Sequence, residues 1–377
     1  MGTIKAATDG DRKLPPVLAG VSGGELHTLK PLISLVVPAY NEAAIVEKNL
    51  CVLCQYLESI EANYRWEMIV VNDGSSDETG KLAEAFAKSR DNVQVLHHPR
   101  NFGLGRALRS AFSRCCGDYI VTVDVDLSYA PIYVEQLLAK MRKSNAQVVA
   151  ASPYMKGGKI SNVPTLRRIL SVSANRFLSI AARGNLSTLT GMVRAYDRKF
   201  LSKLSLRSTG MEINPEIIYK TMLLSGSIEE IPAHLDWKFQ KAEGVKRRSS
   251  MKILRQMFSV LLSGFLFRPV SFFLFPGFVL LLFALYADAW VLIHFFEHYV
   301  NLAHYSRIDI RASAAVIAAF NAAPHTFIIG GLASILSIQL ISLGILALQS
   351  RNYFEEIFHL GTSLYAVVQD KRSGENE

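Results

Sequence analysis

Two aspartates at the end of an apolar stretch are the residues in this sequence best suited to chemistry. Asp124 and Asp126 lie in the run VTVDVDLSYAP, which begins at Val121. Side chains two positions apart on a strand point to the same face, so both carboxylates can face one site. Because like charges repel and resist burial, the pair needs a compensating charge, which a divalent cation that carries a diphosphate ligand would supply. The alternative is an aspartate pair that opens a turn before SYAP.

Three further polar stretches follow β-type runs. VVPAYNE places Glu42 after one run, and VNDGSSDETG places Asp73 after the next. Asp73 is suited to accept a hydrogen bond from a nucleobase, and Gly74 permits close approach of the backbone. HPRNFGLGRALRSAF places glycines and Arg106 at the start of a predicted helix, where an anion is favoured.

Short β-branched runs alternate with helical patterns from Leu32 onward. The predicted strands are LISLVVPAY, EMIVVND, VQVLHHP, DYIVTVDVD and AQVVAASPY, with a helical segment between each pair. This alternation predicts an α/β fold of right-handed βαβ units, with a mostly parallel sheet covered on both faces. Ligands of such sheets bind at the carboxyl ends of the strands, where all four polar stretches lie.

The apolar character of the chain is concentrated in its last third. The 377 residues have a mean hydropathy of +0.21. Two stretches, about 269–296 and 326–349, are long and apolar enough to cross a bilayer, which takes roughly 20 residues. The predicted organisation is a leader without a signal-peptide pattern (1–30), a catalytic domain (31–248), an interfacial helix (249–267), a two-span membrane region (268–350) and a tail (351–377).

The net charge of +9 indicates an anionic surface or substrate. Seven lysines and arginines fall between 238 and 255, just before the first predicted span, which favours lipid headgroups over nucleic acid. By the positive-inside rule this is an integral membrane protein with a cytoplasmic catalytic domain. The four cysteines show no zinc spacing and are predicted to be structural thiols.

In the order VPAYNE, VNDGSSDETG, RNFGLGRA and DVDLSYAP, the polar stretches resemble those of family-2 glycosyltransferases, which have a glycosyltransferase A (Rossmann-like) fold. The closer resemblance is to the polyprenyl-phosphate glycosyltransferases, the dolichyl-phosphate mannose synthase type. It covers about residues 32–236, and the two-span tail is like that of the membrane-embedded members.

The resemblance implies a donor site for a UDP- or GDP-linked hexose and a site for Mg²⁺ or Mn²⁺. Asp124, Asp126 and Ser128 would be the metal ligands, with Ser128 standing where many relatives have glutamine. The implied nucleotide-sugar residues are Pro38, Tyr40, Glu42, Asp73, Gly105, Arg106, Asp124, Val125 and Asp126.

The resemblance also implies a polyprenyl (dolichyl or undecaprenyl) phosphate acceptor, bound by Arg167, Arg168, Ser171 and Lys238. Pro153 stands where the family has a loop arginine. The implied sugar pocket consists of Thr190, Gly191, Arg194 and Glu212. The alternatives are a solvated helix face for the basic residues and a helix N-terminal charge for Glu212.

The implied reaction is a metal-dependent, inverting displacement at the anomeric carbon. An acceptor phosphate is already anionic, so positioning and charge control suffice, and the catalytic residues would be Asp124, Asp126, Arg167 and Ser171. No Ser/His/Asp triad is expected, and His97, His98 and His234 are not predicted to be catalytic. Two rivals remain: a polysaccharide synthase, whose QxxRW-type motif is not found, and a non-catalytic membrane assembly protein. The sugar, the base, the isoprenoid length and self-association through the membrane helices are left open.

Overall fold

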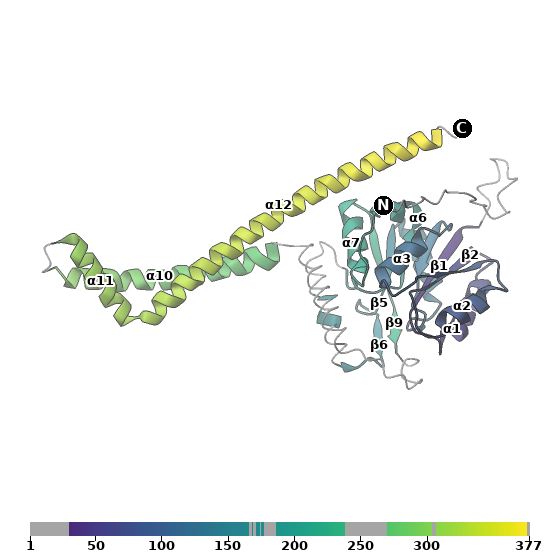
Figure 1. The fold of residues 1–377 in the computed structure, drawn as a ribbon, viewed down its shortest axis with the longest axis horizontal. Helices are drawn as coiled ribbons and strands as arrows, with labels where there is room; N and C mark the ends of the chain where they lie inside the picture. The colour runs from purple at the N-terminus through teal and green to yellow at the C-terminus, as the bar shows by residue number, and fades with distance from the viewer. Residues whose placement is uncertain are drawn as a thin grey trace, which may run out of the picture.

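The computed structural model describes residues 30–165, 168, 171–173, 175–176, 186–237, 270–303 and 307–374. An α/β part comes first, and a group of long helices follows (Figure 1). The predicted leader up to residue 29, the predicted interfacial helix and two predicted acceptor residues, Arg167 and Lys238, lie outside the described residues.

The centre of the α/β part is a seven-stranded sheet in the order β3-β2-β1-β4-β7-β5-β8. Strand β7 is antiparallel to its neighbours β4 and β5, and the other pairs are parallel, which confirms the predicted mostly parallel sheet. The strands are β1 (Leu32–Ala39), β2 (Arg65–Asn72), β3 (Val93–His97), β4 (Tyr119–Thr122), β5 (Val148–Ser152), β7 (Arg194–Asp197) and β8 (Ile228–Pro232). A separate two-stranded parallel sheet joins β6 (Lys159–Ser161) to β9 (His234–Asp236).

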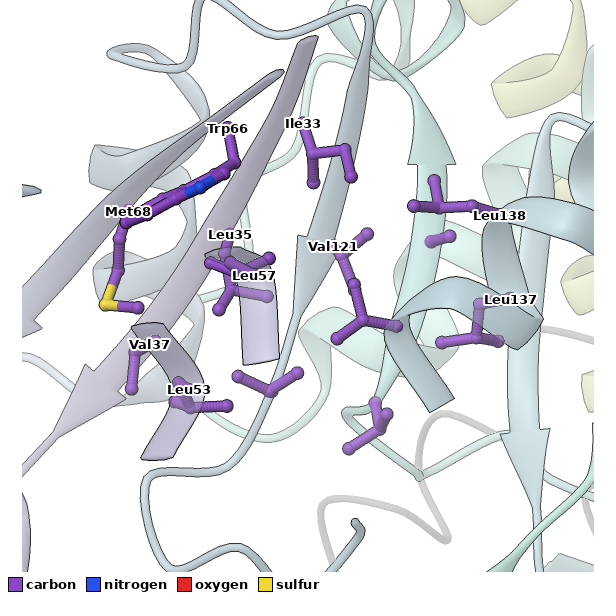
Figure 2. Close-up of a cluster of buried hydrophobic side chains, with 14 of the residues drawn as sticks. Ile33, Leu35, Val37, Leu53, Leu57, Trp66, Met68, Val121, Leu137 and Leu138 are labelled. Atoms are coloured by element: carbon purple, nitrogen blue, oxygen red, sulfur yellow. The ribbon is translucent and has the colours of Figure 1, made fainter. Parts of the chain in front are cut away.

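Helices cover both faces of the large sheet because its strands bury side chains on both sides. One face packs against α1 (Val46–Ser59), α2 (Thr79–Ala87) and α4 (Tyr133–Ser144), and the other against α3 (Leu104–Phe112), α6 (Arg198–Leu201) and α7 (Ile213–Leu223). Leu35 and Val37 of β1 join the first core, beside Leu53 and Leu57 of α1 (Figure 2), whereas Val36 joins the second. Successive residues point to opposite faces and both faces are buried, which is why these strands appear in the sequence as continuous apolar runs.

Pro38 lies within β1, although proline is unfavourable in a central strand. The pairing of β1 with β4 covers only Ile33–Val36, and the amide of Val123 donates to Val36 as the last bond on that side. Pro38 comes two residues later and would present its missing N–H to the same side. The strand therefore continues to Ala39 against β2 without a lost hydrogen bond.

Two helices are long and apolar enough to cross a membrane, over Phe272–Asn301 and Pro324–Thr362. They belong to α10 (Phe275–Asn301), preceded by one π-helical stretch at Val270–Leu274, and to α12 (Pro324–Gly374), with α11 (Ile308–Ala322) between them. Both predicted apolar helices are present. Their limits differ, because α12 continues without a break through the predicted tail until Gly374.

Helices α10 and α12 pack closely through glycines. A Cβ on Gly277 of α10 would lie 3.0 Å from Ile341, and a Cβ on Gly344 of α12 would lie 2.7 Å from Leu274. Small residues of this kind let apolar helices approach where lipid offers no hydrophobic driving force. The pair also contains a polar contact, in which Ser334 donates to Asp288 at 2.8 Å.

The last part of α12 returns to the α/β part and packs on α7. The rings of Tyr219 and Phe354 are stacked with centroids 6.3 Å apart, and the ammonium of Lys220 lies 5.5 Å from the Phe358 ring centroid. The two parts of the chain are thus connected by side-chain packing as well as by the backbone.

Candidate active site

The loops after β1 and β2 form one polar edge at the carboxyl ends of these strands. The side-chain oxygen of Asn41 accepts from the backbone amide of Ser76 at 2.8 Å, and the backbone amide of Asn41 donates to the Ser75 hydroxyl at 3.0 Å. Asn41 has a φ of 55°, a left-handed conformation that asparagine tolerates well. The amide of Glu42 donates to Thr79 at 2.7 Å. The two motifs that were predicted separately from the sequence therefore lie together.

Asp124 and Asp126 lie just beyond β4, at the same edge. Both are half-buried and alternate with the buried residues Val123 and Val125. Burial and then the negative charge of Asp124 raise the pKa of the Tyr129 phenol, which places this neutral ring near the Asp124 carboxylate.

The segment after Asp124 also forms a turn. The amide of Leu127 donates to the carbonyl of Asp124, and the amide of Ser128 donates to the Asp126 carboxylate at 2.9 Å. The alternative from the sequence, an aspartate pair that opens a turn, is therefore present in the structure. Strand β9 lies beside this turn, because the amide of Asp236 donates to the carbonyl of Ser128 at 2.9 Å.

Asn49 of α1 supports the turn from below. It is buried, with 8% exposure, and its amide group donates to the carbonyl of Val125 at 2.8 Å. Val125 stands between the two aspartates, so this hydrogen bond fixes the backbone that carries both carboxylates. Sequence reasoning missed Asn49, because it lies in a helix 76 residues from its partner.

We expect Asn49→Leu to lower the sugar transfer that the sequence resemblance implies by about 10- to 100-fold, because the Val125 carbonyl loses its donor and the turn shifts. The loss should appear mainly in kcat and in metal affinity. Asn63→Leu, at an exposed position of the α1–β2 connection, is the matched control. Steady-state kinetics with varied metal concentration measure the effect, and equal rates for both variants would contradict it.

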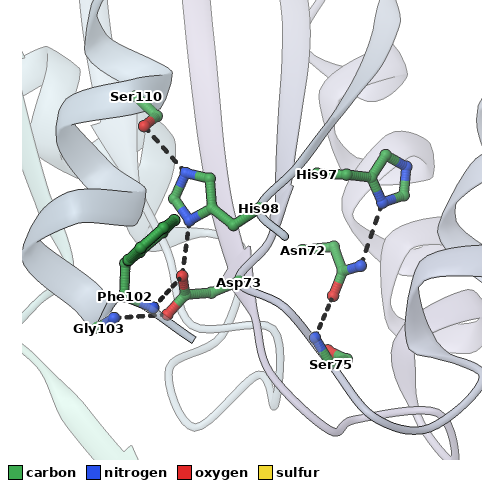
Figure 3. A network of polar contacts seen from close by, with 8 residues as sticks. All are labelled: Asn72, Asp73, Ser75, His97, His98, Phe102, Gly103 and Ser110. Atoms are coloured by element: carbon green, nitrogen blue, oxygen red, sulfur yellow. Dashed lines mark hydrogen bonds and ion pairs between the residues drawn. The ribbon is translucent and has the colours of Figure 1, made fainter. Parts of the chain in front are cut away.

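Asp73 forms a polar network with the loop before α3 (Figure 3). Nδ1 of His98 lies 2.6 Å from Oδ1 of Asp73, and the amides of Phe102 and Gly103 donate to its two oxygens at 3.0 and 2.8 Å. Ser110 lies 3.0 Å from Nε2 of His98. A Ser–His–Asp chain was not expected from the sequence. Here it ties β2, the glycine loop and α3 together, so Asp73 organises this loop whether or not it also contacts a base.

The start of α3 is covered by the segment before α7. The amide of Arg106 donates to the carbonyl of Thr209 at 3.1 Å, and a Cβ on Gly105 would lie 2.6 Å from the carbonyl oxygen of Ser208. The Arg106 amide therefore already has an acceptor, and the binding of an anion at this helix start stays a prediction. The Arg106 side chain is exposed at the same place.

The covering segment is itself held by α7. Glu216 accepts from the amides of Arg207 and Ser208 at 2.9 and 2.8 Å and from Lys220 at 2.7 Å. Although burial opposes its ionisation, the hydrogen bonds from Lys220 and Ser208 hold the pKa of Glu216 below its usual value. Gly103 and Gly105 thus leave room for residues 208–209, a segment that Glu216 holds against α3.

We expect Gly105→Ala to destabilise the fold by about 1–3 kcal/mol, because the new methyl group meets a backbone carbonyl that cannot rotate away. Urea unfolding of the full chain in detergent, followed through the buried Trp66, measures this. Gly361→Ala is the control, since nothing lies within 4 Å of the position that its Cβ would occupy. A stability equal to that of the control would refute the proposed clash.

The predicted acceptor segment lies beside Tyr154. The hydroxyls of Tyr154 and Ser171 are 2.6 Å apart, and Asn175, 1% exposed, donates to Thr190 and accepts from its amide. This brings Ser171 near the predicted sugar-pocket residue Thr190. Arg168 is exposed. Sequence reasoning named neither Tyr154 nor Asn175 as a site residue, although both lie within residues 32–236, which the resemblance covers.

Arg194, which the resemblance assigns to the sugar pocket, is 0% exposed, so its side chain is not accessible to a sugar in this structure. Its terminal nitrogens donate to the carbonyls of Asn214 and Leu189 at 2.9 and 2.7 Å. Arg194 therefore supports the two segments that flank the predicted sugar pocket. Glu212 is half-buried before α7 and accepts from the amide of Gly210 at 2.8 Å, and Gly191 is half-buried.

The residues at the sheet edge fit a divalent cation that a substrate also ligates. Within the described ranges, no three or more His, Cys, Asp or Glu side chains are grouped to hold a metal. Mg²⁺ commonly takes only one or two protein carboxylates and completes its coordination with phosphate oxygens and water. Asp124 and Asp126 supply that number, with Ser128, 6% exposed, directly after them.

Comparison with known proteins finds similarity to glycosyltransferases. Residues 34–205 match the model of the family "Glycosyl transferase family 2". The chain is 29% identical to the polyprenol monophosphomannose synthase of Mycolicibacterium smegmatis over 63% of this chain and 90% of that protein. It is 25% identical to the dolichol-phosphate mannosyltransferase of Pyrococcus furiosus over 61% of this chain and 63% of that protein.

Two further similarities are to a longer protein and to a solved structure. Glycosyltransferase AglD of Haloferax volcanii is 27% identical over 55% of this chain, which spans only 33% of that protein. A solved structure of glucosyl-3-phosphoglycerate synthase from Mycobacterium tuberculosis, in complex with Mn²⁺, UDP and phosphoglyceric acid, has a TM-score of 0.46 at 22% identity, over 62% of this chain and 78% of that chain.

The mostly parallel sheet, the polar edge and the family match together define a family 2 glycosyltransferase domain with a glycosyltransferase A fold. Residues 34–205 therefore form a glycosyltransferase domain, and the C-terminal region adds two apolar helices that could span a membrane.

Proposed function

We propose that this glycosyltransferase moves a hexose from a UDP- or GDP-linked donor to a polyprenyl phosphate, using Mg²⁺ or Mn²⁺ and inverting the anomeric centre. The observation that carries the proposal is the pair of half-buried carboxylates at the sheet edge, in a chain whose last third provides two helices of spanning length. The similarity to the M. smegmatis polyprenol monophosphomannose synthase over 90% of that protein supports the acceptor class.

The donor nucleotide is proposed to lie across the carboxyl ends of β1, β2 and β4. Tyr40 is 39% exposed beside Pro38 and Glu42, so its ring is accessible to a base or ribose. Arg106 is exposed and can approach the donor from α3. Asp124 and Asp126 would hold the divalent metal ion, which would supply positive charge for the diphosphate leaving group.

The acceptor phosphate is proposed to lie near Ser171 and Tyr154, whose hydroxyls can donate to its oxygens. Arg168, and Arg167 and Lys238 from outside the described residues, would add positive charge. Burial raises the pKa of the Tyr154 phenol, so this group remains a neutral donor at physiological pH. Thr190, Gly191 and Glu212 would border the hexose, with Arg194 as a positioning residue behind them.

The proposed reaction needs no strong general base. An oxygen of the acceptor phosphate forms a bond to the anomeric carbon while the bond from that carbon to the donor diphosphate breaks. The nucleoside diphosphate leaves with the electron pair. The side chains of this site contribute by holding two anionic molecules close together and by limiting their repulsion.

The proposed setting is the cytoplasmic membrane face. A polyprenyl phosphate carries its reactive group at the membrane surface, and two spanning helices would return the chain to the side from which it entered. The packing of Phe354 and Phe358 against α7 would hold the α/β part close to that surface.

The test is transfer by the purified full-length protein in detergent or liposomes. Radiolabelled UDP- and GDP-hexoses are supplied in turn with a polyprenyl phosphate and Mn²⁺ or Mg²⁺, and the lipid extract is analysed. We expect one donor to yield an acid-labile lipid-linked sugar that disappears with EDTA. Transfer to a polysaccharide or a different lipid instead, or no transfer from any donor, would contradict the proposal.

A further inference from the structure

A cavity at the opposite edge of the sheet is lined by two arginines. Its volume is about 390 Å³, and the residues around it include Arg109 on α3 and Arg198 on α6. The remaining lining consists of serines, one cysteine and apolar side chains, among them Phe112, Ile120 and Leu201. The cavity thus combines positive charge with apolar walls and contains no acidic side chain.

This cavity is separate from the candidate active site. Ile120 is the second residue of β4, whereas Asp124 follows the end of that strand. Four residues of extended chain span about 13 Å, so the two sites lie at opposite ends of β4. The cavity is therefore not an extension of the proposed donor or acceptor site.

Arg198 has capacity to bind an anion. Its Nε is buried and has no hydrogen-bond partner in the described part of the chain. Asp197, the preceding residue, accepts from the amide of Phe200 at 2.7 Å. Asp118, whose carbonyl accepts from the Arg198 amide, accepts through its carboxylate from the amide of Leu32 at 2.9 Å. A buried guanidinium nitrogen without an acceptor is unfavourable, and a bound anion would supply one.

Arg109 is oriented by the fold. Its Nη1 donates to the carbonyl of Arg207 at 2.9 Å, which leaves its other N–H groups available. Among the described residues, no ion pair joins either Arg109 or Arg198 to a carboxylate. Burial raises the pKa of the Cys115 thiol to about 12, so this cavity residue is neutral and does not offset the two positive charges.

We propose that this cavity binds an organic phosphate monoester, with the phosphate between Arg109 and Arg198 and a ring or short apolar group against Phe112 and Leu201. Arginine pairs suit phosphate because the guanidinium fork donates two parallel hydrogen bonds. The volume is in the range of small-molecule sites, and the apolar walls favour an ester over the free ion. The site would act beside the transfer reaction and does not depend on the proposed function.

The experiment is calorimetric titration of the full-length protein in detergent with phenyl phosphate, with EDTA present and no nucleotide, so that metal-dependent phosphate binding is suppressed. The variants are Arg198→Gln and Lys199→Gln. Both remove one positive charge, but Lys199 is exposed and does not line the cavity. We expect wild type and Lys199→Gln to bind equally, Arg198→Gln to bind at least about tenfold more weakly, and inorganic phosphate to bind more weakly than phenyl phosphate.

Equal affinity in all three proteins, or no binding by wild type at about 10 mM, would overturn the proposal. Hydrogen–deuterium exchange of the wild type gives a second measurement that needs no variant. Phenyl phosphate should protect amides of residues 198–206, and unchanged exchange there at a saturating concentration would also overturn it.

Discussion

Asp126→Asn should lower sugar transfer by at least about a hundredfold. The substitution keeps the size of the side chain and an oxygen that can accept from the Ser128 amide, so the turn after β4 should persist. It removes one of two negative charges that would hold the metal, and loss of metal-derived charge stabilisation costs several kcal/mol of barrier. The rate of lipid-linked sugar formation at saturating donor and metal measures the effect.

Asp91→Asn is the matched control, because Asp91 is exposed in the connection after α2 and the substitution removes the same charge. Its rate should equal that of wild type. If Asp126→Asn retained more than about a tenth of the activity while binding metal normally, the aspartate pair could not be the metal site.

Arg194→Met should destabilise the α/β part by about 2–5 kcal/mol. The fully buried guanidinium donates to the carbonyls of Asn214 and Leu189, and methionine would leave both buried acceptors without a donor, at about 1–3 kcal/mol each. Burial itself lowers the pKa of Arg194, which shows that the charge is costly in place. Removing the buried charge therefore offsets part of the stability that is lost with the two hydrogen bonds. Urea unfolding of the full chain, followed through Trp66, measures the difference.

The control for this variant is Arg114→Met, at an exposed position after α3, which should change stability by less than about 0.5 kcal/mol. The two flanking segments also border the proposed hexose, so Arg194→Met should raise KM for the donor even where the protein is folded. A variant as stable as the control would show that other groups hold these carbonyls.

Much of the α/β architecture could be predicted from the sequence, because strands buried on both faces leave short, continuous β-branched runs. LISLVVPAY and EMIVVND became β1 and β2, and their neighbours alternate with helices as expected. The parallel arrangement then brings their carboxyl ends to one edge, which explains how four distant polar stretches could be placed together from the sequence alone.

Partners of buried polar groups could not be predicted in this way. β7, which carries Arg194, was not among the predicted strands, and no local pattern shows that it enters the sheet antiparallel between β4 and β5. In the same way, GLGR looked like a free helix start, and only the fold brings Thr209 against it. His98 acquired its role from Asp73 and Ser110, which lie 25 and 12 residues away.

The length of α12 was underestimated for a different reason. Hydropathy falls after residue 349, which indicates the end of a membrane span, but helix formation depends on propensity and packing rather than on hydropathy. Arg351 and Glu355 form an i,i+4 pair at 2.7 Å, and Phe354 packs on Tyr219. These contacts extend the helix into the region that was predicted only as a tail.

Direct observation of Mn²⁺ at the sheet edge tests the central claim most closely. Electron paramagnetic resonance titration of the full-length protein with Mn²⁺, in the presence of UDP or GDP, reports the free ion. We predict one bound Mn²⁺ per chain with the matching nucleotide, no comparable binding by Asp124→Asn or Asp126→Asn, and normal binding by Asp91→Asn. Undiminished Mn²⁺ and nucleotide binding by both aspartate variants would contradict a metal site between these carboxylates.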